Sequence, residues 1–177
     1  RYTSGDDYHY DAILMPYDII ASCAHVNGLA RIGVISEQEK NSLLLGLESL
    51  KSEWSEGKIV ITPLDEDCHT VIENYLVKQL GNVGKKVHTG RSRNDQILVA
   101  MRLYMKASLL EVRKKTETLA GEFFLFAKKY QDVPLPGYSH TQQAMLSSVG
   151  HYFCSYLESI LDDIDFLDAV HTHIDKN

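Results

Sequence analysis

Apolar positions along the chain recur at helical spacing over long intervals that contain few prolines. Only four prolines occur in 177 residues, and the intervals between them are rich in Leu, Ala, Glu and Lys. These residues lose little side-chain freedom in a helix, whereas proline removes a backbone donor. The pattern therefore predicts an all-α fold.

The first part of the chain predicts three helices of ordinary length. The first covers residues 12–30, with Pro16 near its start, and ends around residues 31–33. The second begins with a capping box formed by Ser36 and Glu39, and Gly57 ends it. The third opens within "DEDCH" and ends before Gly81. Their predicted buried stripes are Leu43, Leu47, Leu50 and Trp54 on the second helix, and Ile72, Leu76 and Leu80 on the third.

Two longer helices are predicted after residue 90. Residues 91–130 contain no proline, and a helix of that length extends roughly 60 Å. Apolar residues recur every seven positions as Leu98, Met105, Val112, Leu119 and Phe126, flanked by Leu109, Phe123 and Tyr130. A second series comprises Leu146, Phe153, Ile160, Leu167 and Ile174, with Leu157 and Ile164 beside it. A two-helix hairpin cannot cover stripes this wide, so other helices must come from further sequence or other subunits.

This organisation predicts a small amino-terminal helical domain over residues 1–89 and the first part of a long-helix bundle over residues 90–177. The net charge of −6 and the pI near 5.7 argue against binding to nucleic acid or to an anionic membrane. No apolar run approaches the roughly 20 residues of a membrane span. The cysteines are odd in number and widely spaced, which favours reduced thiols and a cytoplasmic location; they are Cys23, Cys68 and Cys154.

Candidate chemistry gathers in "KKVHTGRSRNDQ", residues 85–96, immediately before the first long helix. Two guanidinium groups with hydroxyl and amide side chains, placed where helical N–H groups are unpaired, suit a ligand with carboxylates or phosphates. A solvated helix cap with incidental charge is the alternative. Capping alone does not require two Arg around a Ser in a loop that contains Gly90.

A second polar cluster is "PGYSHTQQ", residues 136–143, in the connection between the long helices. Taken alone, it predicts a turn and a helix start capped by Ser139, and His140 has several interpretations: base, hydrogen-bond donor or surface group. In one antiparallel hairpin the two clusters lie at opposite ends. Copies packed antiparallel would bring them together, giving sites shared between subunits. His171 and His173 face different sides of a helix, which argues against a metal site there.

The stretches "VHTGRSRNDQ" and, after one long helix, "PGYSHTQQA" resemble those of the argininosuccinate lyases of the fumarase and aspartase superfamily. "YDIIASCAH" and "EDCHTVIENYL" extend this resemblance over nearly the whole chain. The resemblance implies reversible elimination of fumarate from argininosuccinate to release arginine, in a homotetramer with a central helical bundle. It implies no metal and no organic cofactor.

The resemblance also implies roles for particular residues. Asn94, Arg93 and Ser22 would contact substrate, and His69 would line the pocket. Ser139 stands where the family usually has Thr, and His140 matches the family's catalytic histidine, as a general base or a group that orients one. Three subunits build each site in this family.

Members of this family run well beyond 177 residues, so we expect the chain to be an amino-terminal piece with an incomplete bundle that is inactive or weakly active alone. Two alternatives stay open. One is a non-enzymatic structural protein of the same family, as the lens delta-crystallins are. The other is a helical assembly module whose loops bind no ligand.

Overall fold

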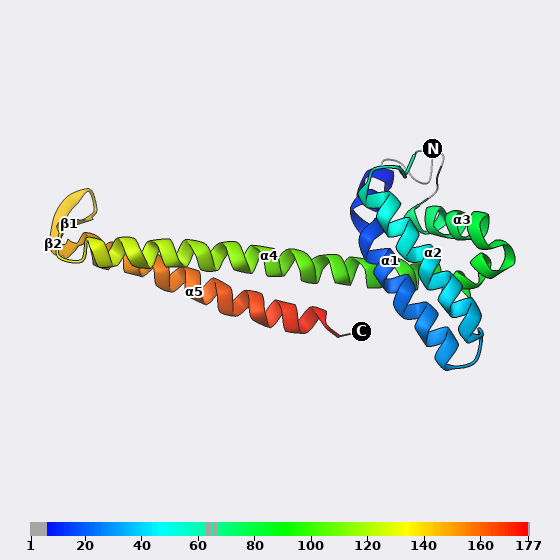
Figure 1. The fold of residues 1–177 in the computed structure, drawn as a ribbon. Coiled ribbons are helices and arrows are strands. Elements are labelled where there is room, and N and C mark those ends of the chain that lie inside the picture. Colours follow the sequence, from blue (N-terminus) through cyan, green and yellow to red (C-terminus); the bar gives the residue numbers. More distant parts are fainter. Residues whose placement is uncertain (1–6, 63–64, 66, 177) are drawn as a thin grey trace. The chain divides into compact units, whose positions relative to one another are not determined.

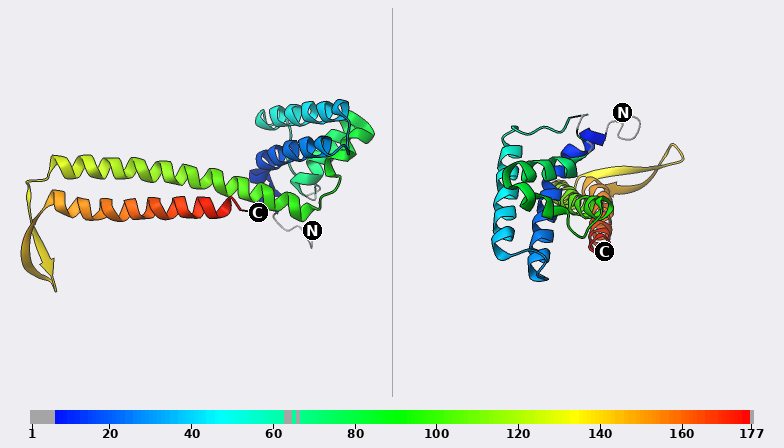
Figure 2. Two further views of the ribbon diagram at one scale, coloured as in Figure 1. Left: turned by 90° about the horizontal axis from the view of Figure 1, so that it is seen from below. Right: turned by 90° about the vertical axis from the view of Figure 1, so that its right-hand side faces the viewer.

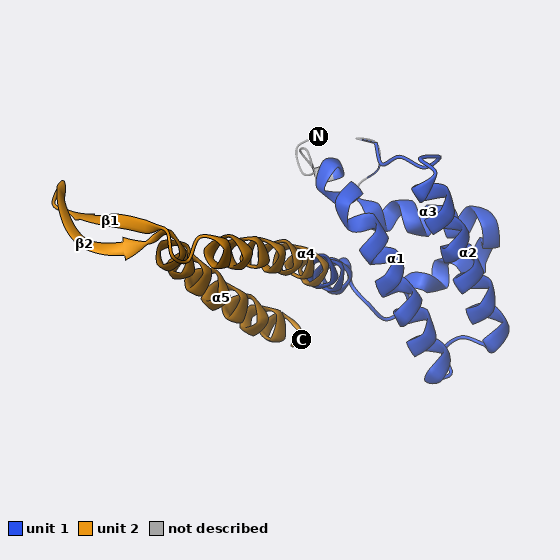
Figure 3. Ribbon diagram, turned by 60° about the vertical axis from the view of Figure 1, so that its left-hand side comes forward, with its two compact units in different colours: residues 1–104 blue, residues 105–177 orange. Residues whose placement is uncertain are grey.

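The computed structural model describes residues 7–62, 65 and 67–176, and within them it is almost entirely helical (Figure 1). This confirms the predicted all-α class, with one small two-stranded sheet added. The contacts divide the chain into two compact units, residues 1–104 and 105–177, and the division falls within helix α4 (Figure 3). The predicted domains, 1–89 and 90–177, stay a prediction. The elements in order are α1 Asp7–Arg31, α2 Glu37–Ser55, α3 Cys68–Leu80, the 3-10 helix η1 Gly81–His88, α4 Arg93–Lys129, β1 Pro134–Ser139, β2 Gln142–Ser148 and α5 Val149–Ile174.

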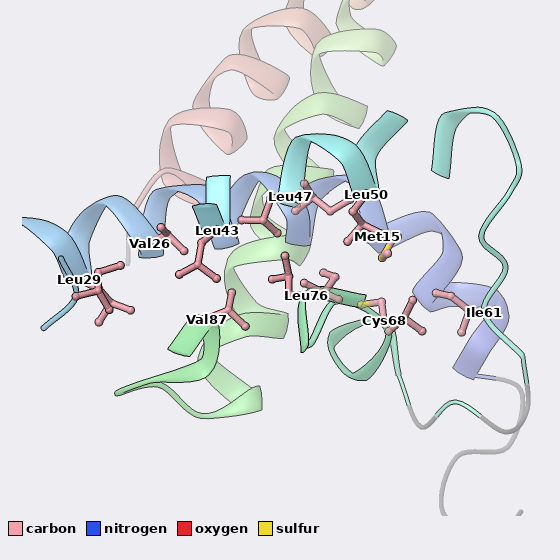
Figure 4. Packing of buried hydrophobic residues seen from close by; sticks show 14 residues of the cluster. Met15, Val26, Leu29, Leu43, Leu47, Leu50, Ile61, Cys68, Leu76 and Val87 are labelled. Atoms are coloured by element: carbon pink, nitrogen blue, oxygen red, sulfur yellow. The ribbon is translucent and has the colours of Figure 1, made fainter. Parts of the chain in front are cut away.

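Unit 1 has a hydrophobic core to which α1, α2, α3 and η1 all contribute (Figure 4). The predicted stripe of α2 is confirmed for Leu43, Leu47 and Leu50, which are fully buried, while Trp54 is half-buried against the core. Leu76 of α3 is fully buried as well. Burying one such side chain stabilises a fold by roughly 1.5–3 kcal/mol. The core members are Met15, Ile19, Val26, Leu29, Ile35, Leu43, Leu47, Leu50, Ile61, Cys68, Val71, Ile72, Leu76 and Val87.

The helix boundaries of unit 1 follow from local chemistry. Ser36 and Glu39 form the predicted capping box at the start of α2, and Gly57, just beyond its end, has a φ of +70° that favours glycine. Asp67 caps α3 by accepting from the Thr70 N–H at 2.7 Å. The predicted start of the first helix was wrong: α1 begins at Asp7, so Pro16 lies inside it, between the fully buried Met15 and Ile19. Their burial offsets the roughly 3 kcal/mol cost of an interior proline.

The segment between α3 and α4 is less open than the predicted loop. Residues 81–88 form η1, which packs on α3, and Gly84 makes this approach possible. A Cβ added at Gly84 would lie 2.4 Å from the carbonyl carbon of Leu76. The irregular part of "KKVHTGRSRNDQ" is therefore short, and η1 holds it against the core of unit 1.

In unit 2, β1 and β2 form an antiparallel hairpin with an irregularity between Pro136 and Tyr138. The predicted turn is present at His140 and Thr141, but the predicted helix start capped by Ser139 was wrong, because Ser139 ends β1 and α5 begins ten residues later with Ser148 as its cap. Proline fixes φ and restricts the residue before it to extended backbone, so Pro134 and Pro136 favour a strand over a helix. Leu146, assigned by the heptad pattern to a helix, lies in β2.

Within unit 2, α5 runs beside the second part of α4 (Figures 1 and 2). The N–H of Gly150 donates to the Tyr130 carbonyl at 3.1 Å, and a Cβ at Gly150 would lie 2.5 Å from the Cα of Gln131. Phe153 packs on Phe126 with ring centroids 4.5 Å apart. Arg113 donates to both carboxylate oxygens of Asp168 at 2.6 and 3.1 Å.

The apolar stripes of α4 and α5 differ in how far they are buried. On α5 the predicted series is half-buried, and Ile164 is buried. On α4 the flanking residues Leu109 and Phe123 are half-buried, whereas the seven-residue series of the sequence is exposed. Of the helices described, none combines the length and apolar character needed to cross a membrane. The exposed members are Leu98 (57%), Met105 (40%), Val112 (49%), Leu119 (48%) and Phe126 (41%).

Candidate active site

The start of α4 is organised by its own side chains. Ser92 Oγ accepts from the Asn94 N–H at 3.0 Å, and the carboxylate of Asp95 accepts from the Ser92 N–H at 2.8 Å. This arrangement works as a capping box, since the Ser92 side chain satisfies a backbone N–H inside the helix and the Asp95 side chain satisfies the backbone N–H of Ser92. It leaves the Asn94 side chain exposed.

Beside this start lies a buried polar network centred on Asp18 of α1. The Nδ1–H of His69 donates to Asp18 Oδ2 at 2.6 Å. Gln96 donates through Nε2 to both carboxylate oxygens, at 3.2 and 3.3 Å. In the neutral ring, this bond from Nδ1 fixes the tautomer of His69 and makes Nε2 an acceptor. Asp18 is fully buried, and His69 and Gln96 are 6% and 3% exposed.

Arg91 brings a half-buried positive charge to the same region. Its guanidinium donates to Ser22 Oγ at 3.0 Å, and Ser22 is fully buried. Burial lowers the pKa of Arg91, and the negative charge of Asp18 opposes that shift. Its Nε is buried without an acceptor among the described residues. A carboxylate is the kind of acceptor that such a donor lacks.

Arg93 lies at the edge of the cluster. It donates to Asp67 Oδ2 at 2.9 Å and to Thr70 Oγ1 at 3.1 Å, which ties the start of α4 to the start of α3. Its side chain is 44% exposed. Ser22, His69, Arg93 and Asn94, which come from α1, α3 and α4, thus all belong to unit 1.

Two further groups of unit 1 have shifted pKa values. Burial lowers the pKa of His25, whose Nε2–H donates to the Thr89 carbonyl at 2.9 Å. Burial also raises the pKa of the Cys68 thiol far above its usual value, and the nearby carboxylate of Asp18 raises it further. Cys68 therefore stays protonated in the absence of a cation.

The other two candidate residues lie at the tip of the hairpin in unit 2. Ser139 ends β1, and His140 and Thr141 form the two-residue connection to β2. Both connection residues have positive φ, 49° for His140 and 65° for Thr141, as a type I′ turn requires. This region is unfavourable for a β-branched residue such as Thr141. The turn presents the exposed imidazole of His140 to its surroundings.

The sequence identified most of the residues that gather in unit 1, but it did not identify the hydrogen bonds that join them. It singled out Ser22, His69 and the residues at the start of α4, and these lie in one unit. It missed Asp18, although the four-residue spacing to Ser22 puts both on one face of α1. That spacing, together with the presence of an acidic residue in an otherwise apolar stretch, could have identified Asp18 as a member of the site.

Comparison with known proteins gives a consistent picture. The model of a family described as "Lyase" matches residues 3–176. The argininosuccinate lyase of Sorangium cellulosum is 46% identical over 176 residues, which is 99% of this chain and 41% of that protein. The argininosuccinate lyase of Thermotoga neapolitana is 38% identical over 177 residues, which is 100% of this chain and 44% of that protein. The chain thus spans about two fifths of the length of these relatives.

Solved structures share the fold. An EDDS lyase in complex with formate matches with a TM-score of 0.80 and 24% identity, over 93% of this chain and 32% of that chain. The fumarate lyase:delta crystallin from Brucella melitensis matches with a TM-score of 0.75 and 17% identity, over 94% of this chain and 43% of that chain. At these identities the likeness concerns the fold alone.

Proposed function

This chain belongs to the lyase family, and from that premise we propose that it forms part of an argininosuccinate lyase. The reaction is the reversible elimination of fumarate from argininosuccinate, which releases arginine. One observation carries the proposal. In the stretch "VHTGRSRNDQ", an exposed amide and two guanidinium groups lie at one helix start beside the network around Asp18. Relatives named argininosuccinate lyase, up to 46% identical to this chain, support the same function.

The cluster in unit 1 binds the succinate part of the substrate in this proposal. Asn94, Arg93 and Ser22 supply donors for its carboxylates, and His69 lines the pocket with its ring held by Asp18. Arg91 keeps the Ser22 hydroxyl in place through the bond at 3.0 Å. Donors fixed before the substrate arrives stabilise the charge that develops in the transition state without reorganising.

The chemistry is a proton removal followed by loss of a nitrogen. A base takes the proton from the carbon beside a carboxylate, and the electrons of that C–H bond spread into the carboxylate. They then form the C=C bond of fumarate while the C–N bond breaks, and the guanidinium nitrogen takes up a proton. His140 is the base or orients it, and the Ser139 hydroxyl binds substrate beside it.

We propose that the hairpin tip of one copy completes the cluster of another copy. Long helices packed antiparallel in a closed oligomer bring their opposite ends together. The exposed apolar series of α4 supports such packing, because a stable subunit buries stripes of this kind. The assembly proposed is a homotetramer with shared sites, and this chain alone is inactive or nearly so.

A cytoplasmic location also belongs to the proposal. Cys23, Cys68 and Cys154 are all free thiols in the structure, which suits a reducing compartment.

Fumarate release from argininosuccinate tests the function directly. The assay uses this chain and a protein of the relatives' full length that contains it. We expect turnover in the longer protein, reduced by about 10²–10⁴-fold in His140→Gln, because a positioned acid or base contributes that much. The matched control His173→Gln, at an exposed position of α5, should retain activity. An intact oligomer that neither turns over nor binds argininosuccinate would overturn the proposal.

A further inference from the structure

We propose that Asp18, Cys68 and His69 form a binding site for one divalent transition-metal ion of the zinc or cobalt type. Each residue offers one ligand atom, and the three atoms lie within 4.8 Å of one another. All three residues are buried in unit 1, with relative exposures of 0% for Asp18 and Cys68 and 6% for His69. The site lies beside the substrate cluster and serves no step of the elimination proposed above.

The distances fit a tetrahedral ion with modest adjustment. Zinc bonds of about 2.3 Å to sulfur and 2.0–2.1 Å to nitrogen or oxygen place sulfur about 3.5 Å from each other ligand atom. Cys68 Sγ lies 3.7 Å from His69 Nδ1 and 3.9 Å from Asp18 Oδ2. Nδ1 and Oδ2, now 2.6 Å apart in a hydrogen bond, must separate to about 3.3 Å.

The charges of the site also favour a divalent cation. Coordination removes the Cys68 proton, so a thiolate and the carboxylate of Asp18 together neutralise a charge of +2. Asp11 is buried nearby, and Asp11 and Asp67 add negative potential at the Cys68 sulfur. The opposing charge is Arg91, which interacts electrostatically with Asp18.

The donor set selects the class of metal. A thiolate and an imidazole suit zinc, cobalt and similar borderline ions, whereas magnesium and calcium prefer sets made of oxygen alone. Gln96, which donates to both oxygens of Asp18, orients the carboxylate as an outer partner would. Three protein ligands leave the fourth position to water, as in exchangeable rather than closed sites.

Occupation of the site would change what His69 offers to its pocket. While Nδ1–H of the neutral ring donates to Asp18, Nε2 is an acceptor. A metal bound at Nδ1 displaces that proton, and the neutral ring then carries its hydrogen on Nε2, which becomes a donor. The metal would thereby reverse the hydrogen-bonding character of a group that we place in the substrate pocket.

Cobalt(II) titration of the metal-free full chain tests the proposal, because cobalt bound to a thiolate gives a sulfur-to-metal charge-transfer band. We expect one equivalent to produce this band in the near ultraviolet. Cys68→Ser should abolish it and weaken cobalt binding by at least about 100-fold, more than loss of an outer partner does. The matched control Cys154→Ser, at an exposed thiol, should leave both unchanged.

Cys68→Val is the second variant, because it fills the buried position with an apolar side chain. It thereby avoids the buried hydroxyl without a hydrogen-bond partner that Cys68→Ser could introduce. It should also lack the band, with circular dichroism reporting an unchanged helix content. Two results would overturn the proposal. One is the absence of a band in the folded wild-type chain with cobalt in excess. The other is a band that persists in folded Cys68→Val or disappears in Cys154→Ser.

Discussion

Unit 1 collects fourteen hydrophobic residues into one buried cluster, whereas in unit 2 the buried hydrophobic residues among those described are Ala120, Ala127 and Ile164. The difference does not reflect a shortage of apolar residues in unit 2. Large side chains there, including Leu125 at 60% and Phe166 at 68%, are exposed. Unit 1 has a buried core of its own, although Ile32 and Leu45 are exposed on it, whereas the described residues of unit 2 form no comparable core and leave large apolar side chains uncovered.

The polar candidate residues follow the same division. Asp18 and His69 are held by short bonds inside unit 1, so their geometry is set by that unit's own core. His140 and Ser139 lie at an exposed turn of unit 2. One half of the proposed site is therefore preorganised within a unit, and the other half depends on what packs around the hairpin.

The largest expected effect is the difference in unfolding free energy lost by Leu47→Ala in unit 1 and by Leu119→Ala in unit 2. Leu47 is fully buried in unit 1, so its truncation should cost about 2–5 kcal/mol of unfolding free energy. Leu119 is 48% exposed, and its truncation should cost less than about 1 kcal/mol in dilute solution. Urea denaturation of both variants gives the two values. Equal losses would mean that the α4 series is already covered in solution.

Gly84→Ala tests the packing of η1 on α3. The new Cβ would meet backbone atoms of Leu76 at 2.4 Å, which cannot move away as a side-chain end can. We expect a loss of about 1–3 kcal/mol or more. Gly28→Ala is the matched control, since nothing lies within 4 Å and helix propensity predicts a gain of roughly 0.5–1 kcal/mol. Thermal melts that rank the two variants in the opposite order would contradict the described packing.

A smaller effect is expected from pH. Folded His25 resists protonation because burial lowers its pKa, whereas the unfolded chain takes up the proton near the ordinary pKa of 6.5. Its contribution to stability is therefore present above about pH 6.5 and is lost as the pH falls below that value. The loss is small, because His25 is only half-buried and solvent screens part of the effect. Urea midpoints between about pH 7.5 and 5.5 should fall less in His25→Gln than in the wild-type chain, and parallel curves would refute this assignment.

Local signals in the sequence predicted much of unit 1. The capping box at Ser36, the stop at Gly57 and the stripe of Leu43, Leu47 and Leu50 depend on neighbouring residues, so a single sequence reveals them. The Asp18 to His69 bond joins residues 51 positions apart and had no such signal.

Unit 2 was harder to predict. The heptad pattern located both long helices, but it assigned Leu146 to a helix where the prolines before it favour a hairpin. Periodicity also could not decide which of two adjacent stripes on α4 faces α5, because both are apolar. That choice depends on the neighbours of α4, and in the structure Leu109 and Phe123 are half-buried while the seven-residue series is exposed, although Phe126 of that series packs on Phe153 of α5.

The central claim is that the proposed site joins the cluster of unit 1 to a hairpin tip from another copy. Two inactive variants of the longer protein, Asn94→Ala and His140→Gln, test it when they are unfolded, mixed and reassembled. Random mixing in equal amounts should restore about a quarter of the sites, each taking Asn94 from one copy and His140 from another. Fumarate release near that fraction is the predicted result, and mixed assemblies as inactive as either parent would contradict the account.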